Sequence, residues 1–310
     1  MFDVLVLGEL NADIILRGDV EPAWAQAEKL LDDATLTLGS SSAIFAAGVA
    51  RLGLRVAFAG VVGDDILGAF CRERLAALGV DTSNVVVDPA LRTGMTVILQ
   101  RPDDRAMFTY LGAIAALSAA HVSPAALQAA RHVHVGSYWL QTALQPDLAG
   151  LFECARAGGA TTSLDTNWDP SERWAGLEAL LAHTDMLLPN ETEAMALAAA
   201  LGGPAGSPQE ALETLAGVVP TVAIKCGADG GLAARGAERS AAPALPSPFV
   251  DAVGAGDSFD AGFVCGMLAQ WPLYRCLQLA IACGSLSTRA AGGTAAQATI
   301  EEALAAIDQC

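Results

Sequence analysis

Residues 251–262 read DAVGAGDSFDAG, and this stretch says more about the fold and chemistry of the chain than any other. A Gly-Ala-Gly turn leads directly into Asp257 and a segment of helical composition. The start of a helix leaves backbone N–H groups unpaired and carries the positive end of the helix dipole. Gly254 and Gly256 have no Cβ, so an anion can approach the main chain closely. An amide cradle beside a carboxylate is what phosphoryl transfer to an alcohol requires.

A purely structural interpretation of this stretch stays open, namely a glycine-rich turn whose acidic residue favours a helix start. Two familiar nucleotide-binding patterns are absent. The glycines at 254, 256 and 262 are too widely spaced for GxGxxG, and GxxxxGK[ST] occurs nowhere. The turn therefore belongs neither to a dinucleotide-binding fold nor to a P-loop.

The composition fits one large α/β domain spanning residues 1–310, since 53% of the residues are hydrophobic. The formal net charge is −17, and the two lysines are Lys29 and Lys225. Such a charge repels nucleic acid and anionic membranes, so we expect neither as a partner. Nucleotide phosphates must then be held by backbone amides, a metal ion and a few arginines.

Processing and redox signals are weak in this sequence. Seven cysteines show no CxxC spacing, so we expect neither a zinc site nor a disulfide framework. The first residues, MFDVLVLGEL, lack the basic start of a signal peptide. The longest charge-free run contains Gly112, His121 and Pro124, which argues against a membrane span. We therefore expect a cytoplasmic protein.

Short apolar runs alternate with Ala/Leu-rich segments along the chain. This alternation predicts a mostly parallel sheet with helices on both faces. The predicted strands are 2–7, 55–62, 132–135, 161–165, 185–188 and 220–225. The predicted helices are 42–52, 65–78, 144–157, 174–182, 191–201, 208–217, 255–269, 273–290 and 300–308.

Two insertions interrupt the alternation. Residues 11–18 and 34–38 follow the first strand, and 93–100 is expected to pair with 105–111 through the turn RPDD at 101–104. From their pattern alone, these extra strands are equally compatible with simple decoration of a sheet edge.

The stretch from Asp251 to Phe259 resembles the signature D-T-x-G-A-G-D-x-F of the ribokinase-like family of carbohydrate and nucleoside kinases, also called the PfkB family. The resemblance implies a three-layer α/β sandwich with a small β-lid, built from insertions at about 11–38 and 93–111, that often mediates homodimerisation. It implies that Asp257 is the catalytic base and that the amides of Gly254, Ala255 and Gly256 form the anion hole. The usual threonine of the signature is Ala252 here.

Two further blocks resemble the acceptor side of the family. Asn11 and Asp13 match its N-A-D pattern, whose aspartate binds the sugar; taken alone they also fit a polar turn. The family's G-G-x-x-x-N block becomes Gly39, Ser40, Ser41, Ser42, Ala43 and Ile44. The serines either cap the following helix or donate hydrogen bonds to acceptor hydroxyls. Loss of the asparagine at Ile44 argues against D-ribose and favours a less polar acceptor.

The second strand of the 93–111 insertion carries Arg105, which matches a frequent arginine of the family. The resemblance implies that it meets a phosphate or the acceptor, and a solvated strand arginine is equally compatible with the sequence.

Three blocks resemble the nucleotide side. Asp165-Thr166-Asn167 matches D-x-N and is expected to line the active cleft. Asn190 to Glu193 matches N-x-x-E, whose glutamate supports Mg²⁺ through water, although an Asn-then-Glu helix start is also ordinary capping chemistry. Lys225, Gly227 and Gly230 match a strand-end motif against which the ribose and phosphates of ATP lie.

A monovalent cation, K⁺, binds many members of the family beside the D-T-x-G block. The matching positions are Asp251 and Val253. His132 and His134 have no company typical of metal ligands, and they alternate along a predicted strand. We interpret both histidines as structural.

Together these blocks predict an ATP- and Mg²⁺-dependent kinase that phosphorylates a hydroxymethyl group of a sugar or sugar-like molecule. A neutral acceptor is favoured over a phosphorylated one, because the acceptor blocks contain few cations. Two alternatives stay open: a nucleoside kinase of the same fold, and a non-catalytic sensor of sugars or nucleotides. The intact Asp257 and its neighbouring glycines argue against the sensor.

Overall fold

The computed structural model describes residues 1–25, 27–101 and 104–309. Its main sheet has nine strands: β1 (Phe2–Leu7), β4 (Val56–Gly63), β5 (Asp81–Asp88), β8 (Ala130–Val135), β9 (Thr161–Leu164), β10 (Met186–Leu187), β11 (Thr221–Lys225), β12 (Gly231–Arg235) and β13 (Glu238–Ala242). Their order is β13-β12-β11-β10-β9-β8-β1-β4-β5. All neighbours from β11 to β5 pair in parallel, and β12 and β13 add an antiparallel edge. The predicted α/β fold with a mostly parallel sheet is confirmed.

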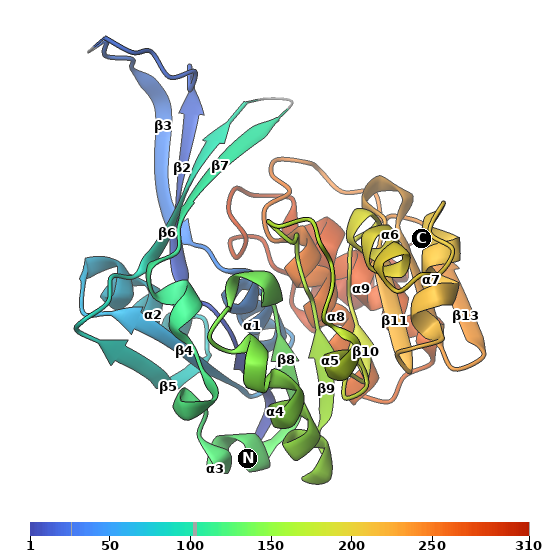
Figure 1. Cartoon of the computed structure of the whole chain (residues 1–310). Helices are drawn as coiled ribbons and strands as arrows, with labels where there is room; N and C mark the ends of the chain where they lie inside the picture. The colour runs from blue at the N-terminus through green and yellow to red at the C-terminus, as the bar shows by residue number, and fades with distance from the viewer. Residues whose placement is uncertain (26, 102–103, 310) are drawn as a thin grey trace.

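Helices cover both faces of this sheet (Figure 1). The α-helices are α1 (Ser41–Arg51), α2 (Ile66–Ala77), α3 (Pro124–Ala129), α4 (Gln145–Ala157), α5 (Glu178–Leu181), α6 (Glu191–Ala200), α7 (Pro208–Ala216), α8 (Ala255–Leu268), α9 (Leu273–Ser287) and α10 (Ile300–Ile307). Successive side chains of a strand point to opposite faces, so β1 contributes to two cores. Val4 and Val6 pack with α1, α8 and α9, whereas Leu5 and Leu7 pack on the α4 side.

A separate four-stranded sheet stands out from the body in Figure 1. Its strands are β2 (Asn11–Gly18), β3 (Leu31–Leu38), β6 (Gly94–Gln100) and β7 (Arg105–Tyr110), in the order β3-β2-β6-β7. The hairpins β2–β3 and β6–β7 are antiparallel and join through the parallel pair β2–β6. Strand β3 begins at Leu31, earlier than predicted. Pro102 and Asp103 of the predicted turn lie outside the described residues.

Some elements differ from the sequence-based expectation. The predicted helix 174–182 is reduced to α5, because Trp174 and Gly176 adopt positive φ values of 52° and 88° that a helix cannot contain. Strands β5, β12 and β13 are not among the predicted strands. They lie at the two ends of the sheet, and their sequences, DTSNVVVD, GLAAR and ERSAA, have shorter apolar runs than a central strand such as β1. Within the described residues, no helix combines the length and apolarity needed to cross a membrane.

Two buried histidines form a hydrogen-bonded row along the middle of the main sheet. His132 bonds Thr161 through Nδ1 at 2.8 Å and Ser163 through Nε2 at 2.7 Å. His134 bonds the same Ser163 hydroxyl at 2.7 Å and stacks on Phe45 with ring centroids 3.6 Å apart. Burial lowers the pKa of His132 to about 3. Burial, together with the nearby His132 and Lys225, lowers the pKa of His134 well below its usual value.

We expect His132 to make stability depend on pH. Between pH 6.5 and about 3 the unfolded chain binds a proton at this position and the folded chain does not, so the stability contributed by the neutral ring is lost as the pH falls. Compared with His132→Gln, the wild type should lose about 1.4 kcal/mol of unfolding free energy per pH unit below 6.5. Urea denaturation of both proteins from pH 7.5 to 5 measures this difference. A constant difference over that range would contradict the neutral buried histidine.

Candidate active site

The predicted residues gather at the carboxyl edge of the main sheet, where the first turns of α1 and α8 meet the ends of β9 and β11. Asn167, just after β9, donates from Nδ2 to the Ser41 hydroxyl of α1 at 3.2 Å. Lys225, at the end of β11, donates to Asp165 after β9 and to Asp260 in α8. Segments far apart in the sequence therefore share one site, as ligand-binding segments of open parallel sheets do.

The turn before α8 is built so that only glycine fits at its first position. Gly254 has φ 73°, and a Cβ there would lie 2.6 Å from the Cα of Gly293. The amide of Ala255 donates to the Ala252 carbonyl at 3.2 Å. The amides of Gly254, Gly256 and Asp257 have no acceptor in the part of the chain that the structure describes. The free donors are therefore not quite the predicted set, because the turn itself uses the amide of Ala255.

Asp257 lies in the first turn of α8 with 8% of its surface exposed. Burial and the negative charges of Asp165 and Glu9 raise the pKa of Asp257 to about 8, against the opposing effects of the Lys225 charge and a hydrogen bond from Ser41. A carboxyl group with this pKa is partly ionised near neutral pH, and its ionised form is a stronger base than an ordinary carboxylate.

Lys225 is the centre of a buried ionic cluster. Its Nζ lies 2.7 Å from Oδ2 of Asp165 and 3.0 Å from Oδ2 of Asp260, and the side chains are 11%, 2% and 1% exposed. Burial disfavours the ammonium ion, but the charges of Asp165, Asp260 and Glu193 outweigh it and raise the pKa of Lys225. The lysine is therefore permanently charged.

The ammonium group lies beside the glycine turn. A Cβ on Gly256 would be 3.4 Å from Cδ and 3.7 Å from Nζ of Lys225. The positive charge of Lys225 therefore lies beside Gly256, whose amide has no acceptor within the described residues. This arrangement can hold a dense anion such as a phosphoryl group.

Asp260 was missed by the sequence reasoning. Burial raises the pKa of Asp260 well above its usual value, although the neighbouring Lys225 charge opposes the change. Its Oδ1 atom is buried and has no hydrogen-bond partner within the described residues. The available signal was spacing: Asp260 lies three residues after Asp257, on the same side of a helix.

The acceptor blocks meet at the base of the four-stranded sheet. Asn11 and Asp13 are 4% and 7% exposed, and Asn11 Nδ2 donates to Asp13 Oδ1 at 3.1 Å. A Cβ on Gly39 would collide with both side chains, so this position needs glycine. Burial and the charge of Glu9 raise the pKa of Asp13 to about 7, opposed by the Arg105 charge and by Asn11. Arg105 itself is solvent-exposed on β7.

Glu9 is a second carboxylate that the sequence reasoning did not use. It is 3% exposed and accepts hydrogen bonds from the hydroxyls of Ser42 at 2.6 Å and Ser40 at 3.0 Å. Ser40 is also the N-cap of α1, because its hydroxyl accepts from the Ala43 amide at 2.9 Å. Its φ of 70° explains why a glycine stands at this position in the related pattern.

Ile44 contacts the glycine turn. Its side chain lies so close to Gly254 and Gly293 that a Cβ on either would overlap it, and its carbonyl accepts from Gln297 at 2.8 Å. Ile44 therefore packs α1 against the start of α8. The branched side chain of Ile44 therefore has a packing role, in addition to any contact with the acceptor.

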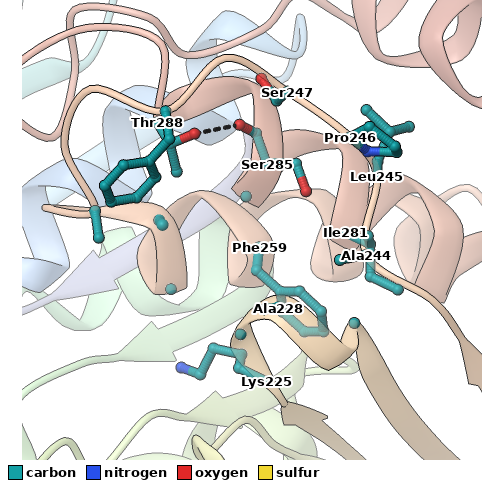
Figure 2. Close-up of a pocket in the computed structure, with 17 residues that line it drawn as sticks. Lys225, Ala228, Ala244, Leu245, Pro246, Ser247, Phe259, Ile281, Ser285 and Thr288 are labelled. Carbon is teal, nitrogen blue, oxygen red and sulfur yellow. Dashed lines mark hydrogen bonds between the residues drawn. The ribbon is translucent and has the colours of Figure 1, made fainter.

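A cavity of about 550 Å³ lies beside Lys225 and is lined by residues of the loop 244–249 and of helices α8 and α9. Figure 2 shows Lys225 at one end, Phe259 in the middle, and Ser285 and Thr288 beyond, with the Thr288 hydroxyl donating to the Ser285 carbonyl at 2.8 Å. Apolar side chains of Leu245, Phe259 and Ile281 line the wall. A polar end and an apolar wall suit a nucleotide.

The predicted motif after β11 lines this cavity with two glycines. Gly227 and Gly230 have φ values of 53° and 91°, and a Cβ on Gly230 would collide with the Ala242 carbonyl. The loop 244–249, which also lines the cavity, was not singled out from the sequence. Residues 243–249 read PALPSPF, and prolines at this density are typical of an irregular segment and give no signal for a ligand site.

Asn190 and Glu193 form a reciprocal cap at the start of α6. The Glu193 amide donates to Asn190 Oδ1, and the Asn190 amide donates to Glu193 Oε2, each at 2.9 Å. Burial and the charge of Asp165 raise the pKa of Glu193 to about 7, opposed by Lys225. Four carboxyl groups, Asp165, Glu193, Asp257 and Asp260, thus lie around a single ammonium group. A divalent cation nearby would favour their ionised forms, so the group fits such a cation.

Direct coordination by several side chains is not available for that cation. Within the described residues, no three Asp, Glu, His or Cys side chains are grouped closely enough to hold a metal ion. A magnesium ion here fits as part of a nucleotide complex, with carboxylates reaching it through water.

Asp251, the predicted monovalent-cation residue, has other partners. Its carboxylate is 3% exposed and accepts from the amides of Val253 and Gly292, each at 3.0 Å. The Arg17 guanidinium, from β2, lies 3.8 Å from the same carboxylate. Arg17 thereby connects the four-stranded sheet to the turn before α8.

Comparison with known proteins agrees with this geometry. A family model described as pfkB family carbohydrate kinase matches residues 1–300. An ATP-dependent ribose-1-phosphate kinase of Halopiger xanaduensis is 31% identical over 298 residues, covering 96% of this chain and 95% of the relative. An acarbose 7(IV)-phosphotransferase of Actinoplanes is 31% identical over 306 residues, covering 93% and 94%.

A solved structure has the same architecture. A protein described as ribokinase II from E. coli, in complex with ATP and Mg²⁺, gives a TM-score of 0.86 at 26% identity and covers 100% of both chains. The chain therefore belongs to the pfkB family of carbohydrate kinases, enzymes that transfer phosphate from ATP to a sugar hydroxyl.

Proposed function

We propose that this kinase transfers the γ-phosphoryl group of ATP to a hydroxymethyl group of a sugar, with Asp257 as the base. The observation that carries the proposal is the pairing of a buried carboxyl group, whose pKa is about 8, with unpaired amides at the same helix start. The acceptor O–H proton moves to Asp257 as its oxygen bonds the γ-phosphorus. The bond from phosphorus to the bridging oxygen breaks, and ADP leaves.

Lys225 and the glycine turn stabilise the group in transfer. The free amides of Gly254 and Gly256 and the nearby ammonium group offer positive potential where the phosphoryl oxygens gather. Hydrogen bonds to Asp165 and Asp260 fix the position of the ammonium group. Gly227 and Gly230 leave room for the nucleotide backbone, and the apolar cavity receives its base.

Mg²⁺ bound with the nucleotide would neutralise part of the phosphate charge. Glu193 is the residue that would hold it, through water, with Asn190 capping the helix that carries the glutamate. K⁺ at Asp251 and Val253 stays a prediction of the sequence resemblance, because the Asp251 carboxylate already lies 3.8 Å from Arg17.

The acceptor site is formed by Asn11, Asp13, Gly39, Ser41 and Arg105, with the four-stranded sheet as its lid. Neutral sugars are favoured, since Asp13 is surrounded by the negative charge of Glu9 and the positive charge of the exposed Arg105, and not by a cluster of cations. The two relatives are named for different acceptors, ribose-1-phosphate and acarbose, so the family leaves the acceptor open. A nucleoside acceptor is the second candidate.

We further propose a single kinase domain that acts in the cytoplasm, where ATP is available, and that forms a homodimer through its lid. Met107, Phe108 and Tyr110 on β7 are 60%, 61% and 52% exposed, and Leu36 on β3 is 45% exposed. The lid projects from the body (Figure 1), so a second copy can reach these side chains. Exposed apolar surface of this kind marks interaction sites.

Asp257→Asn should abolish turnover but leave sugar binding intact. Loss of a general base lowers kcat by about 10²–10⁴-fold. ADP release is measured with D-ribose, D-fructose, D-glucose, adenosine and fructose 6-phosphate, and sugar binding by thermal shift. A sensor would show thermal shifts without ADP release in the wild type. Faster turnover of fructose 6-phosphate than of every free sugar would contradict the neutral acceptor.

Lys225→Met should lower kcat by about 10²–10³-fold, as loss of a donor to developing charge does. Because Lys225 opposes the rise in the pKa of Asp257, the acid limb of kcat/KM, expected near pH 8, should move to higher pH in this variant. Lys29→Met removes the other lysine, which is exposed in the lid, and serves as the control. Lys225→Met leaves the buried Asp165 and Asp260 without a counter-ion, so we expect this variant to be less thermally stable than wild type. The double variant with Asp260→Asn should regain thermal stability but keep the low kcat of Lys225→Met. Recovery of both would reduce Lys225 to a structural role.

Phe108→Asp should convert the dimer to a monomer. A charge on this exposed strand cannot be buried unpaired against a second lid. Light scattering after size exclusion gives the mass of the variant, of wild type and of Val218→Asp, an exposed apolar site outside the lid. A wild-type monomer, or a dimer that survives the substitution, would overturn the lid interface.

A further inference from the structure

A second cavity, of about 620 Å³, lies between the end of the lid and the loops that follow β8 and β9. Leu111 lines it just after β7, Trp139 from the loop after β8, and Gln145 from the start of α4. The loop after β9 contributes Asp169, Pro170, Ser171, Arg173, Ala175 and Gly176. It shares no lining residue with the nucleotide cavity. None of the acceptor or nucleotide residues described above lines it. We call it the aromatic cavity.

One tryptophan, Trp139, lines this cavity, and it belongs to a cluster with Trp174 and Trp168, which are not lining residues. Trp139 and Trp168 both pack edge-to-face on Trp174, with ring centroids 6.0 Å and 5.2 Å away at interplanar angles of 84°. The indole N–H of Trp139 is buried and has no acceptor among the described residues. A buried indole N–H normally finds a hydrogen-bond partner, so a ligand oxygen in the cavity would complete this one.

The loop after β9 is strained and rigid. Asn167, Glu172 and Trp174 have positive φ values of 52°, 54° and 52°, a region that non-glycine residues avoid. The Asp169 carboxylate holds this shape by accepting hydrogen bonds from the amides of Ser171, Arg173 and Trp174 at 2.8, 3.0 and 2.8 Å. Strain that is held in this way clusters at ligand sites.

The same loop begins inside the acceptor site. Asn167 accepts from the Ser137 amide at 2.7 Å and donates to Ser41, whose hydroxyl also bonds Asp257. Trp168 follows immediately and is 47% exposed. From Asp169 onward the loop lines the aromatic cavity. The loop therefore runs from a residue that contacts Ser41 to the wall of the aromatic cavity within two residues, so the cavity lies close to the acceptor site.

We propose that the aromatic cavity binds a second sugar ring, joined to the ring that is phosphorylated, so that glycosides or oligosaccharides are the preferred acceptors. This inference rests on the proposed kinase function. The volume of the aromatic cavity lies within the range of about 300–1,000 Å³ typical of ligand pockets. Indole surfaces pack against the apolar face of a pyranose, and few directional polar groups suffice to fix its orientation.

The polar lining fits hydroxyl groups better than an anion. Arg173 is exposed and lines the cavity. Its Nε donates to the Ser171 hydroxyl at 3.2 Å, which leaves the other N–H groups of the guanidinium to donate to sugar oxygens. Asp169 lies in the same wall, and its carboxylate offsets that positive charge. Together with the Trp139 N–H, the lining supplies several donors without a net charge.

The test compares each monosaccharide with its disaccharide. ADP release is measured with D-glucose and maltose, and with D-fructose and sucrose, for wild type, Trp139→Phe and Arg173→Ala. Trp139→Phe keeps an aromatic ring and removes the N–H donor. Arg173→Ala alters an exposed side chain, so we expect this variant to fold as the wild type does. Trp271→Phe, on the turn between α8 and α9, is the matched control.

We expect at least one disaccharide to have a KM about tenfold below that of its own monosaccharide. Both variants should raise the disaccharide KM and leave monosaccharide kinetics within twofold. Equal effects on both acceptors, or no disaccharide better than its monosaccharide, would overturn the second-ring site. If no sugar releases ADP above the rate without acceptor, the proposed kinase function itself fails. If monosaccharides alone are phosphorylated, and Trp139→Phe and Arg173→Ala behave as wild type, only the second-ring site is refuted and the kinase function stands.

Discussion

The ammonium group of Lys225, held between Asp165 and Asp260, is the interaction on which the active site depends. It joins the end of β11 to the end of β9 and to the second turn of α8. Two buried carboxylates without a counter-ion would be expensive, and one lysine satisfies both. The same charge lies beside Gly256 and lowers the pKa of Asp257 below the value that burial alone would produce. Fold and chemistry therefore depend on one ion cluster.

Negative charge is concentrated where a phosphoryl group must travel. Burial raises the pKa of Asp13 and Glu193 to about 7 and that of Asp257 to about 8, so these carboxyl groups exchange protons near neutral pH. A chain with net charge −17 and two lysines cannot surround phosphates with side-chain cations. Backbone amides, one ammonium group and a nucleotide-bound metal ion carry that task. The site is thus electrostatically tuned by depth of burial more than by the number of basic residues.

Much of the fold could be predicted from the sequence, because buried parallel strands such as β1 appear as apolar runs and the start of α8 appears as a glycine turn. The edge strands β5 and β13 have no such run, and the loop 169–176 has a shape imposed by one aspartate that no periodicity reveals. In the site, the resemblance named segments that the structure brings together. It could not reveal Glu9, whose partners lie more than thirty positions away, or the cavity beside Trp139.

Ser40 shows how an active site can replace a glycine and become committed to the change. Its left-handed φ of 70° is a cost that glycine would not have, yet its hydroxyl caps α1 and holds Glu9. Ser42 completes the same contact. Positions 9, 40 and 42 are therefore expected to co-vary through evolution. A lineage that restored glycine at position 40 would lose a partner of the acid at position 9, and with it the selective reason to keep that acid.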